Sequence, residues 1–152
     1  MDTPSPLAEG LVRRIEDAAS ELLGIPFQHL GRSRRGLDCV GVLVTVASEV
    51  GLSDYDIRTY SHRARGHELL GYFGAQMDHI SMRDLSAGDV LVTRDEDEAL
   101  PCHCGIVVRR PGGLGFIHAW ARRRRVVESL LSEWLPWAVR AYRFRTDPEE
   151  VL

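Results

Sequence analysis

A regular spacing of apolar side chains predicts a helix near the start of the chain, from Pro6 to Leu23. The apolar positions recur at intervals of three and four residues, which a helix brings onto one face. They are Leu7, Leu11, Ile15, Ala18, Ala19 and Leu22. Ser5 is a suitable N-cap with Pro6 at the first helical position, and Gly24 ends the run. We therefore expect a helix with one apolar face.

The second apolar run, from Asp38 to Gly51, is open to two interpretations. Its valines favour a strand by their β-propensity. The run is about 12 residues long, however, which exceeds a typical strand, and it lies between an Asp that suits an N-cap and a Gly that ends a helix. Length and caps together favour a buried helix.

A third helix is predicted from His62 to Ile80, after a loop from Asp54 to Tyr60. Three glycines weaken this prediction, because glycine has a low helix propensity. The apolar positions at helical spacing are Leu69, Leu70, Phe73 and Met77.

Short strands replace helices in the second half of the chain. A turn at Ser86–Asp89 precedes a strand at Val90–Val92, and the acidic run Asp95–Glu98 is expected to be a solvated loop. Pro111-Gly112-Gly113 suits the turn of a hairpin. The other predicted strands are the two hairpin segments Gly105–Arg109 and Leu114–Trp120, then Val126–Leu131 and Ala138–Phe144. Helices followed by antiparallel strands predict an α+β domain.

Length and charge narrow the possible functions. A chain of 152 residues, 44% of them apolar, suits one globular domain. We place that domain at residues 6–146, with short tails at 1–5 and 147–152. The formal net charge of −3 gives no general attraction to nucleic acid. No apolar run approaches the roughly 18 residues of a membrane span, and the start lacks the features of a signal peptide, so we expect synthesis in the cytoplasm.

The three cysteines, Cys39, Cys102 and Cys104, do not have the spacing of a disulfide framework. Cys39 begins the predicted buried helix, where unpaired N–H groups and the helix dipole favour a thiolate. On position alone, a buried structural cysteine is the more common alternative. Cys102-His103-Cys104 resembles a set of metal ligands, but alternate residues of a strand point to opposite faces, and no second cluster completes a zinc site. We expect no metal.

The predicted hairpin supplies the base that a nucleophilic cysteine needs. If an even-numbered loop places Arg109 opposite Leu114, then His103 and His118 are diagonal neighbours on one face of the sheet. An odd loop or a bulge would place them on opposite faces. A cysteine, a base and a residue that orients the base form the arrangement used in nucleophilic catalysis.

Four parts of the sequence together resemble the signature of the NlpC-type cell-wall peptidases. Pro26–Gly31 and Gly36–Gly41 resemble the family pattern P-Y-x-W-G-G…G-x-D-C-S-G. Leu85–Val90 resembles its L-x-x-G-D turn. His103–Val108 and Phe116–Ala119 resemble its H-V-G-I-Y and I-H-A strands. The order and spacing of these matches cover nearly the whole chain.

The resemblance implies a papain-like fold in which the nucleophile helix packs on an antiparallel sheet. It assigns Cys39 as the nucleophile, His103 as the general base and His118 as the residue that orients His103. It implies hydrolysis of amide bonds in peptidoglycan stem peptides, commonly the bond between D-γ-glutamate and a diamino acid. No cofactor is implied.

The sequence departs from the family pattern beside the nucleophile. Phe27 stands where the family has Tyr, and Val40 where it has Ser, so two hydroxyls are missing. The candidate substrate-binding residues are Phe27, Asp38, Val40 and Arg35. The arginines at positions 32, 34 and 35 are either a basic rim for stem-peptide carboxylates or a solvated charge run.

Two other classes of function are alternatives. One is a phage-tail structural or binding module with residual activity, against which the retention of Cys39, His103 and His118 argues. The other is a thiol amidase or acyltransferase that acts on a different amide, which the same three residues would also serve. Phage-tail members of the family tolerate similar substitutions. By analogy we expect a peptidase brought to the cell wall by phage-tail or delivery-system proteins.

Overall fold

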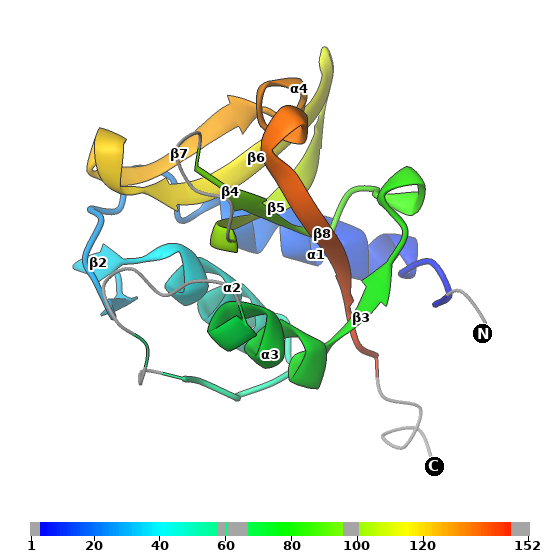
Figure 1. The fold of residues 1–152 in the computed structure, drawn as a ribbon, viewed down its shortest axis with the longest axis horizontal. Coiled ribbons are helices and arrows are strands. Elements are labelled where there is room, and N and C mark those ends of the chain that lie inside the picture. The colour runs from blue at the N-terminus through cyan, green and yellow to red at the C-terminus, as the bar shows by residue number, and fades with distance from the viewer. Residues whose placement is uncertain (1–3, 58–59, 61–66, 96–100, 147–152) are drawn as a thin grey trace.

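A six-stranded antiparallel sheet forms the centre of the computed structural model (Figure 1). The structure describes residues 4–57, 60, 67–95 and 101–146. The strand order is β3-β8-β4-β5-β6-β7. Their bounds are β3 Met77–Ile80, β4 Val90–Arg94, β5 Pro101–Arg110, β6 Gly113–Trp120, β7 Arg125–Leu130 and β8 Ala138–Phe144. The predicted α+β class is confirmed.

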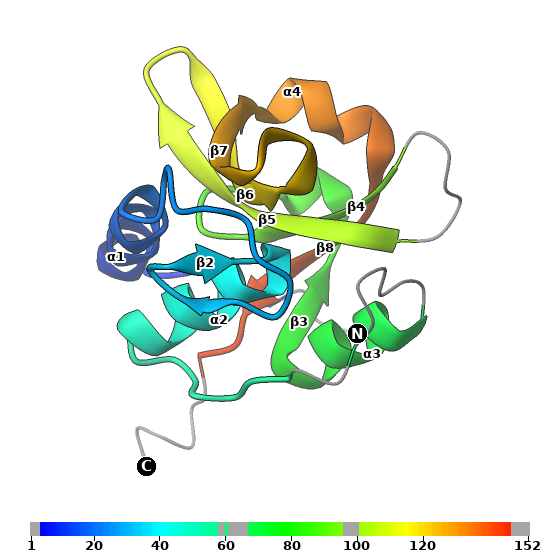
Figure 2. The same ribbon diagram turned by 90° about the vertical axis from the view of Figure 1, so that its left-hand side faces the viewer.

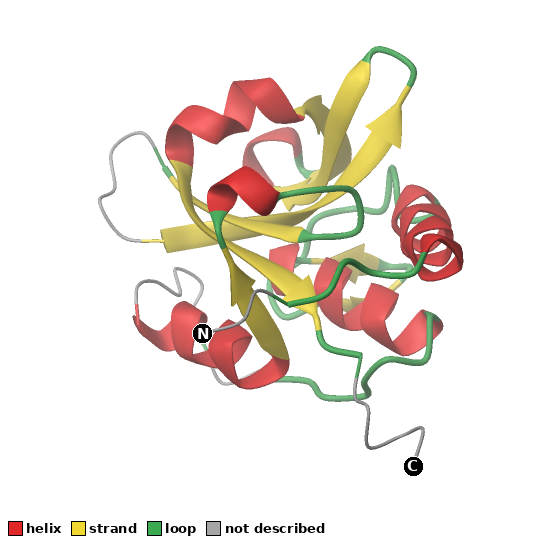
Figure 3. Cartoon of the chain, turned by 90° about the vertical axis from the view of Figure 1, so that its right-hand side faces the viewer, coloured by secondary structure: helices red, strands yellow, loops and turns green. Residues whose placement is uncertain are grey.

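Helices lie on both faces of this sheet (Figure 3). On one face, α1 and α2 pack on a large apolar core, and on the other, α4 covers a smaller one. A two-stranded ladder of β1 and β2 lies beside α2 (Figure 2). The bounds are α1 Glu9–Ser20, β1 Arg32–Ser33, β2 Gly36–Leu37, α2 Cys39–Glu49, α3 His67–Gln76 and α4 Leu131–Trp134, with single 3-10 turns η1 Met82–Asp84, η2 Ala121–Arg123 and η3 Leu135–Trp137. Among the described residues, no helix is long and apolar enough to cross a membrane.

The alternation of side chains along β5 divides the interior into these two cores. Cys104, Ile106 and Val108 face the core under α1 and α2, whereas Val107 belongs to the core under α4. Successive residues of a strand point to opposite faces, so a strand covered on both sides is apolar almost throughout. His103 therefore lies on the α4 side of the strand, and its neighbour Cys104 lies on the α2 side.

The first helix begins later than its apolar pattern predicts. It starts at Glu9 with Ala8 as N-cap, and no side chain caps it, so the predicted start at Ser5 and Pro6 is wrong. The guanidinium of Arg143 on β8 donates hydrogen bonds to the carbonyl oxygens of Pro4 (3.3 Å) and Ser5 (3.5 Å). This tertiary contact holds the segment before α1 in a non-helical conformation.

The third predicted helix divides into a helix and a strand. Helix α3 ends at Gln76, and Met77–Ile80 form β3, which pairs with β8 at the edge of the sheet. Met77 and Ile80 are buried there. Their spacing of three residues fits a helix or a twisted edge strand, and only the distant β8 decides between them. Residues 62–66 of the predicted helix and 96–98 of the acidic run lie outside the described residues.

A buried ion pair joins the turn before β4 to β8. Arg143 donates two parallel hydrogen bonds, from Nε and Nη2, to the carboxylate of Asp89, each 2.8 Å long. Asp89 also accepts from the backbone N–H of Ser86 at 2.9 Å. The side chains of Asp89 and Arg143 are 0% and 5% exposed. Bidentate geometry and further hydrogen bonds are what a buried charge pair requires.

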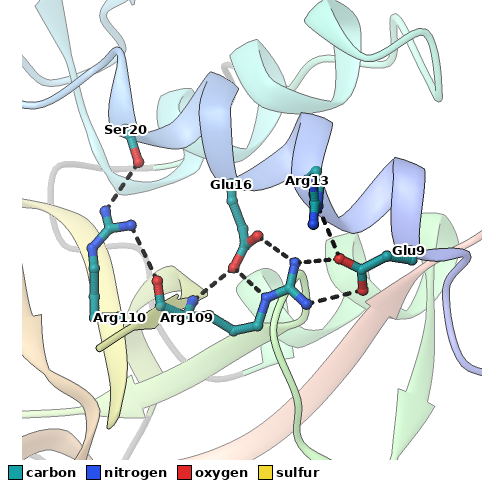
Figure 4. A network of polar contacts seen from close by, with 6 residues as sticks. All are labelled: Glu9, Arg13, Glu16, Ser20, Arg109 and Arg110. Carbon is teal, nitrogen blue, oxygen red and sulfur yellow. Dashed lines mark hydrogen bonds and ion pairs between the residues drawn. The ribbon is translucent and has the colours of Figure 1, made fainter. Parts of the chain in front are cut away.

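A second ionic network fixes the β5–β6 hairpin to α1 (Figure 4). The Arg109 guanidinium bridges Glu9 and Glu16, which lie about two helical turns apart on α1, and the Arg109 backbone N–H donates to Glu16 at 2.7 Å. Arg110 reaches Ser20 of α1 and Glu128 of β7. These contacts align the hairpin with the helix layer.

Replacing Asp89 by alanine should lower the free energy of unfolding by about 3 kcal/mol, because it leaves the buried Arg143 guanidinium without its carboxylate. Urea unfolding followed by tryptophan fluorescence measures the change. Asp78→Ala is the matched control, because the Asp78–Arg145 pair is 40% and 45% exposed. An exposed pair of this kind contributes less than about 1 kcal/mol. Equal losses in the two variants would contradict the role given to Asp89.

Candidate active site

Cys39 is the first residue of α2, and the sequence around it explains why the helix begins there. The preceding Asp38 has an extended backbone, and its Oδ1 accepts a hydrogen bond from the N–H of Gly41 at 2.8 Å. This is the N-cap contact that the sequence predicts. The predicted buried helix is confirmed, from Cys39 to Glu49. The Cys39 sulfur consequently lies at the positive end of the helix dipole, beside N–H groups without intrahelical partners.

Glycine is required at position 41 because the chain before the helix passes very close to it. A Cβ atom at Gly41 would collide with the carbonyl oxygen of Gly31. Val40 lies between the Asp38 cap and Gly41. It is 1% exposed and packs in the core under α2. The tetrapeptide from Asp38 to Gly41 is therefore a structural unit that presents Cys39.

The Asp38 carboxylate holds this unit with four hydrogen bonds. Besides Gly41, Oδ1 accepts from Nη1 of Arg32 at 2.9 Å. Oδ2 accepts from the N–H of Leu30 at 2.8 Å and from the Tyr60 hydroxyl at 2.6 Å. Both oxygens are thus fully used, so the geometry gives Asp38 the role of fixing the start of α2.

Arg32 extends the network to the loop after α2. Its Nε donates to Asp56 Oδ1 at 2.8 Å, and Nη2 donates to the Ile57 carbonyl and the Tyr60 hydroxyl at 2.8 and 2.7 Å. Nη1 also donates to the carbonyl of Gly31 at 2.8 Å. The Arg32 side chain is only 7% exposed. Both sequence interpretations of this residue, a basic rim or a solvated charge, are wrong, because the loop that encloses Arg32 is distant in the chain.

The two hairpin histidines meet as the predicted strand register requires. Arg109 pairs with Leu114, and Ile106 pairs with Ile117. His103 Nε2 lies 2.7 Å from His118 Nδ1. The predicted placement of both histidines on one face is confirmed.

Aromatic rings enclose this histidine pair. The Trp134 ring centroid lies 5.2 Å from that of His103 and 4.7 Å from that of His118, and Phe116 stacks on His118 at 4.7 Å. His118 is fully buried. Burial, and then the charge of His103, lower the pKa of His118 to about 2. His118 is therefore neutral at physiological pH, with one ring nitrogen as donor and the other as acceptor.

Cys39 has the electrostatic environment of a reactive thiol. Hydrogen bonds from Cys104 and His103, together with the positive charge of His103, outweigh burial and lower the pKa of Cys39 to about 5. Burial raises the pKa of Cys102 to about 11, and burial and the contact with Cys39 raise the pKa of Cys104. Cys104 as a donor to Cys39 is a contact that the sequence analysis missed, since no local pattern shows that β5 passes under the start of α2.

The four predicted substrate-binding residues have different surroundings. Asp38 and Val40 are buried at the start of α2. Phe27 is half-buried, packs against the core and donates its backbone N–H to the carbonyl of Arg124 at 2.8 Å. Arg35 is exposed in the turn between β1 and β2. Of these four, only Phe27 and Arg35 have side chains at the surface.

A pocket of about 550 Å³ lies beside the histidine pair, on the α4 side of the sheet. Trp134, which packs on both imidazoles, forms part of its wall. Its lining combines indole rings with side chains of both charges. The lining residues are Arg94, Asp95, Trp120, Arg122, Arg123, Glu128, Ser129, Leu130, Glu133, Trp134 and Trp137. Within the described ranges, no group of three His, Cys, Asp or Glu side chains is arranged to hold a metal ion.

Comparison with solved structures identifies the fold. The chain matches an NLP/P60 family lipoprotein-like protein of Staphylococcus aureus with TM-score 0.68 and 22% identity, over 97% of this chain and 46% of that one. It matches the NlpC/p60 domain of the peptidoglycan hydrolase SagA with TM-score 0.59 and 20% identity, over 88% and 98%. It matches an N-acetylmuramoyl-L-alanine amidase of Bacteroides uniformis with TM-score 0.65 and 13% identity, over 90% and 100%.

The chain thus has the NlpC/P60 papain-like fold, in agreement with the resemblance seen in its motifs. It spans about half the length of the S. aureus protein. No protein-family model matches the sequence, and no curated protein matches it.

Brief treatment with iodoacetamide should label Cys39 before Cys102 and Cys104. With a pKa near 5, Cys39 is a thiolate at pH 6.5, whereas Cys102, with a pKa near 11, stays protonated. Peptide mass mapping at a series of pH values should show a labelling rate for Cys39 that rises through about pH 5. Faster labelling of Cys102 or Cys104 would contradict the assignment.

Removing the Cys104 thiol should make Cys39 less acidic. Cys104→Val retains an apolar, strand-compatible side chain but removes the S–H donor, so the pH midpoint of Cys39 labelling should rise by about one unit. Cys102→Val makes the same change at the neighbouring cysteine and should leave the midpoint in place. A midpoint unaltered by Cys104→Val would mean that the Cys104 thiol does not stabilise the Cys39 thiolate.

Proposed function

We propose that this protein is a cysteine peptidase that hydrolyses amide bonds in peptidoglycan stem peptides. The observation that carries the proposal is the thiol of Cys39 at the start of α2, whose pKa the neighbouring His103 lowers, together with the contact of 2.7 Å between His103 and His118. Enzymes that form an acyl intermediate on a side chain use such a row, in which a nucleophile contacts a base and a third residue orients the base. The names of two structures with this fold, a peptidoglycan hydrolase and an amidase, support the substrate class.

The geometry indicates how each residue acts. Because Nε2 of His103 is engaged with His118, Nδ1 is the nitrogen available to Cys39. The Cys39 thiolate attacks the substrate carbonyl, and N–H groups at the start of α2, including that of Cys39, stabilise the oxyanion. His103 donates its proton to the leaving amine, which releases the first product. Water then gives a proton to His103 and attacks the thioester, which releases the acid and restores the Cys39 thiolate beside protonated His103.

The finer proposal is that the bond joins D-γ-glutamate to a diamino acid. The D-γ-glutamyl residue of such a substrate carries a free α-carboxylate, because its γ-carboxyl forms the bond. The side chains of Arg122 and Arg123 in the pocket beside the histidines, and of Arg35 in the exposed β1–β2 turn, provide guanidinium groups that bind carboxylates in pairs of hydrogen bonds. These exposed guanidinium groups support the proposal of an acidic peptide, although the chain as a whole has a net charge of −3.

An amidase that acts on the amide between sugar and peptide is the second candidate. The observation that favours it is the fold shared with the Bacteroides amidase. The row Cys39–His103–His118 would serve either bond. The identity of the products separates the two activities.

Digestion of purified peptidoglycan, followed by mass spectrometry of the fragments, tests the proposal. We expect fragments with a new diamino-acid N-terminus and none with Cys39→Ala, whose fold is checked by circular dichroism. Release of complete stem peptides from the sugar would indicate the amidase instead. If the folded protein, with a reactive Cys39, cleaved no amide bond in peptidoglycan, the peptidoglycan proposal would be wrong.

His103 and His118 should differ in their tolerance of substitution. His103 transfers protons, so His103→Ala should reduce kcat/KM by roughly 10²- to 10⁴-fold. His118 only orients His103, so His118→Asn, which keeps a hydrogen-bonding side chain, should retain partial activity. The measurement is kcat/KM on a stem peptide. If His118→Ala had full activity, the orienting role of His118 would be excluded.

Stem peptides still attached to sugar should be cleaved at least as well as free ones. The resemblance implies that the hydroxyls of Tyr and Ser at the positions of Phe27 and Val40 help to hold a free N-terminal amine. Phe27 has no hydroxyl, and Val40 is apolar and buried in the core under α2. An ammonium without a polar partner is costly to desolvate, so a free amine should give little advantage. Comparison of kcat/KM for a stem peptide and its muropeptide tests this, with Phe27→Tyr as the matched variant. A tenfold preference for the free peptide, about 1.4 kcal/mol, would contradict it.

A further inference from the structure

The row of hydrogen bonds that begins at His103 continues beyond His118. Nε2 of His118 lies 2.9 Å from Oγ of Ser129 on β7. In the β6–β7 register, His118 pairs with Val127, so Ser129 is its diagonal neighbour on the same face. Three adjacent strands, β5, β6 and β7, thus place His103, His118 and Ser129 in one line.

We propose that Ser129 is a positioning residue of the thiol site: its Oγ accepts a hydrogen bond from Nε2 of His118 and holds the tautomer in which His118 Nδ1 accepts from His103.

Proton placement along the row requires this direction. When Cys39 is a thiolate, the His103 imidazolium carries a proton on each ring nitrogen, so Nε2 must donate to His118. His118 is neutral, since burial and the charge of His103 lower its pKa to about 2. Its single proton must then be on Nε2, and the Ser129 hydroxyl is the acceptor that faces it.

The opposite direction would disfavour the reactive state. If the Ser129 hydroxyl donated to His118, then His118 Nδ1–H would point at Nε2 of His103, which would have to be unprotonated. His103 would then carry its one proton on Nδ1 and could not accept the proton of Cys39. Loss of the Ser129 acceptor leaves a buried N–H of His118 unpaired in the reactive state, so the imidazolium and the thiolate are both less favoured.

The other charged and titratable groups around the row stay unchanged when Ser129 is replaced. Cys39 faces Cys102, Cys104 and His103 of β5, and Asp38 at the start of its own helix. His118 faces His103, with Trp134 of α4 packed against both rings. A change in the acidity of Cys39 on substitution of Ser129 therefore reports on the row itself.

The test measures the rate at which iodoacetamide labels Cys39 as a function of pH. The proposal rests on the thiol chemistry proposed above, but labelling needs no peptidoglycan, so failure of the peptidoglycan assay would not affect the result. Ser129→Ala should raise the pH midpoint by about one unit and slow labelling below that midpoint by about tenfold. Ser129→Thr, which keeps the hydroxyl, should restore the rate to within about twofold of the original. Ser132→Ala, at an exposed position of α4, is the matched control and should have no effect.

Nitrogen chemical shifts of the histidine rings give an independent reading. In the original protein, His118 should carry its proton on Nε2, and in Ser129→Ala this assignment should become a mixture of tautomers. Ser129→Cys, of similar size but with a weaker acceptor, provides the same test should the alanine variant fold poorly. A folded Ser129→Ala protein with unchanged midpoint and unchanged histidine shifts, or a folded Ser129→Thr protein without recovery, would overturn the proposal.

Discussion

The Asp38 carboxylate is the interaction on which the site depends most. A buried negative charge is costly unless several donors surround it. Here four donors do so, and they come from three places in the chain: the first turn of α2, the segment around Leu30 and Arg32, and Tyr60 after α2. Satisfying one carboxylate therefore fixes the start of the helix, the strand before it and the loop after it. Cys39, the next residue, is positioned as a consequence.

The second constraint is the register of three strands. His103, His118 and Ser129 come from consecutive strands, and each is diagonal to the next on the face covered by α4. A slip of one residue in either pairing would move a member of the row to the opposite face. The turn between β5 and β6 contains only Pro111 and Gly112, which leaves little freedom for such a slip.

The two faces of the sheet give the residues of the site two different environments. On the α2 side, Cys39 contacts Cys104 in an apolar core, and two polar partners suffice to make its thiol acidic. On the α4 side, Trp134 and Phe116 pack on His118, which is fully buried. A low local dielectric strengthens a satisfied hydrogen bond and penalises an unsatisfied one. The enclosure therefore makes the proton positions in the row well defined, and it gives each partner a measurable effect on Cys39.

The sequence by itself determined the features that depend on neighbouring residues. The Asp38 cap and the length of the apolar run predict α2 because capping and helix length are local properties. Strand alternation places His103 and His118 on one face if the loop before Leu114 has an even number of residues, and the observed pairing of Arg109 with Leu114 shows that it does. Together with the motifs, these local features are enough to select Cys39, His103 and His118 as candidate catalytic residues and to predict the α+β class.

Only the tertiary structure decided what depends on segments distant in the chain. The strand at Met77–Ile80 exists because β8 offers it hydrogen bonds, and Arg32 is buried because Asp56 and Tyr60 close over it. Cys104 and Ser129 join the site through the packing of α2 on β5 and the pairing of β6 with β7. The pattern of side chains around a residue specifies its secondary structure and the face on which its side chain lies. Which distant residue contacts that side chain is set by how the whole chain buries its apolar surface.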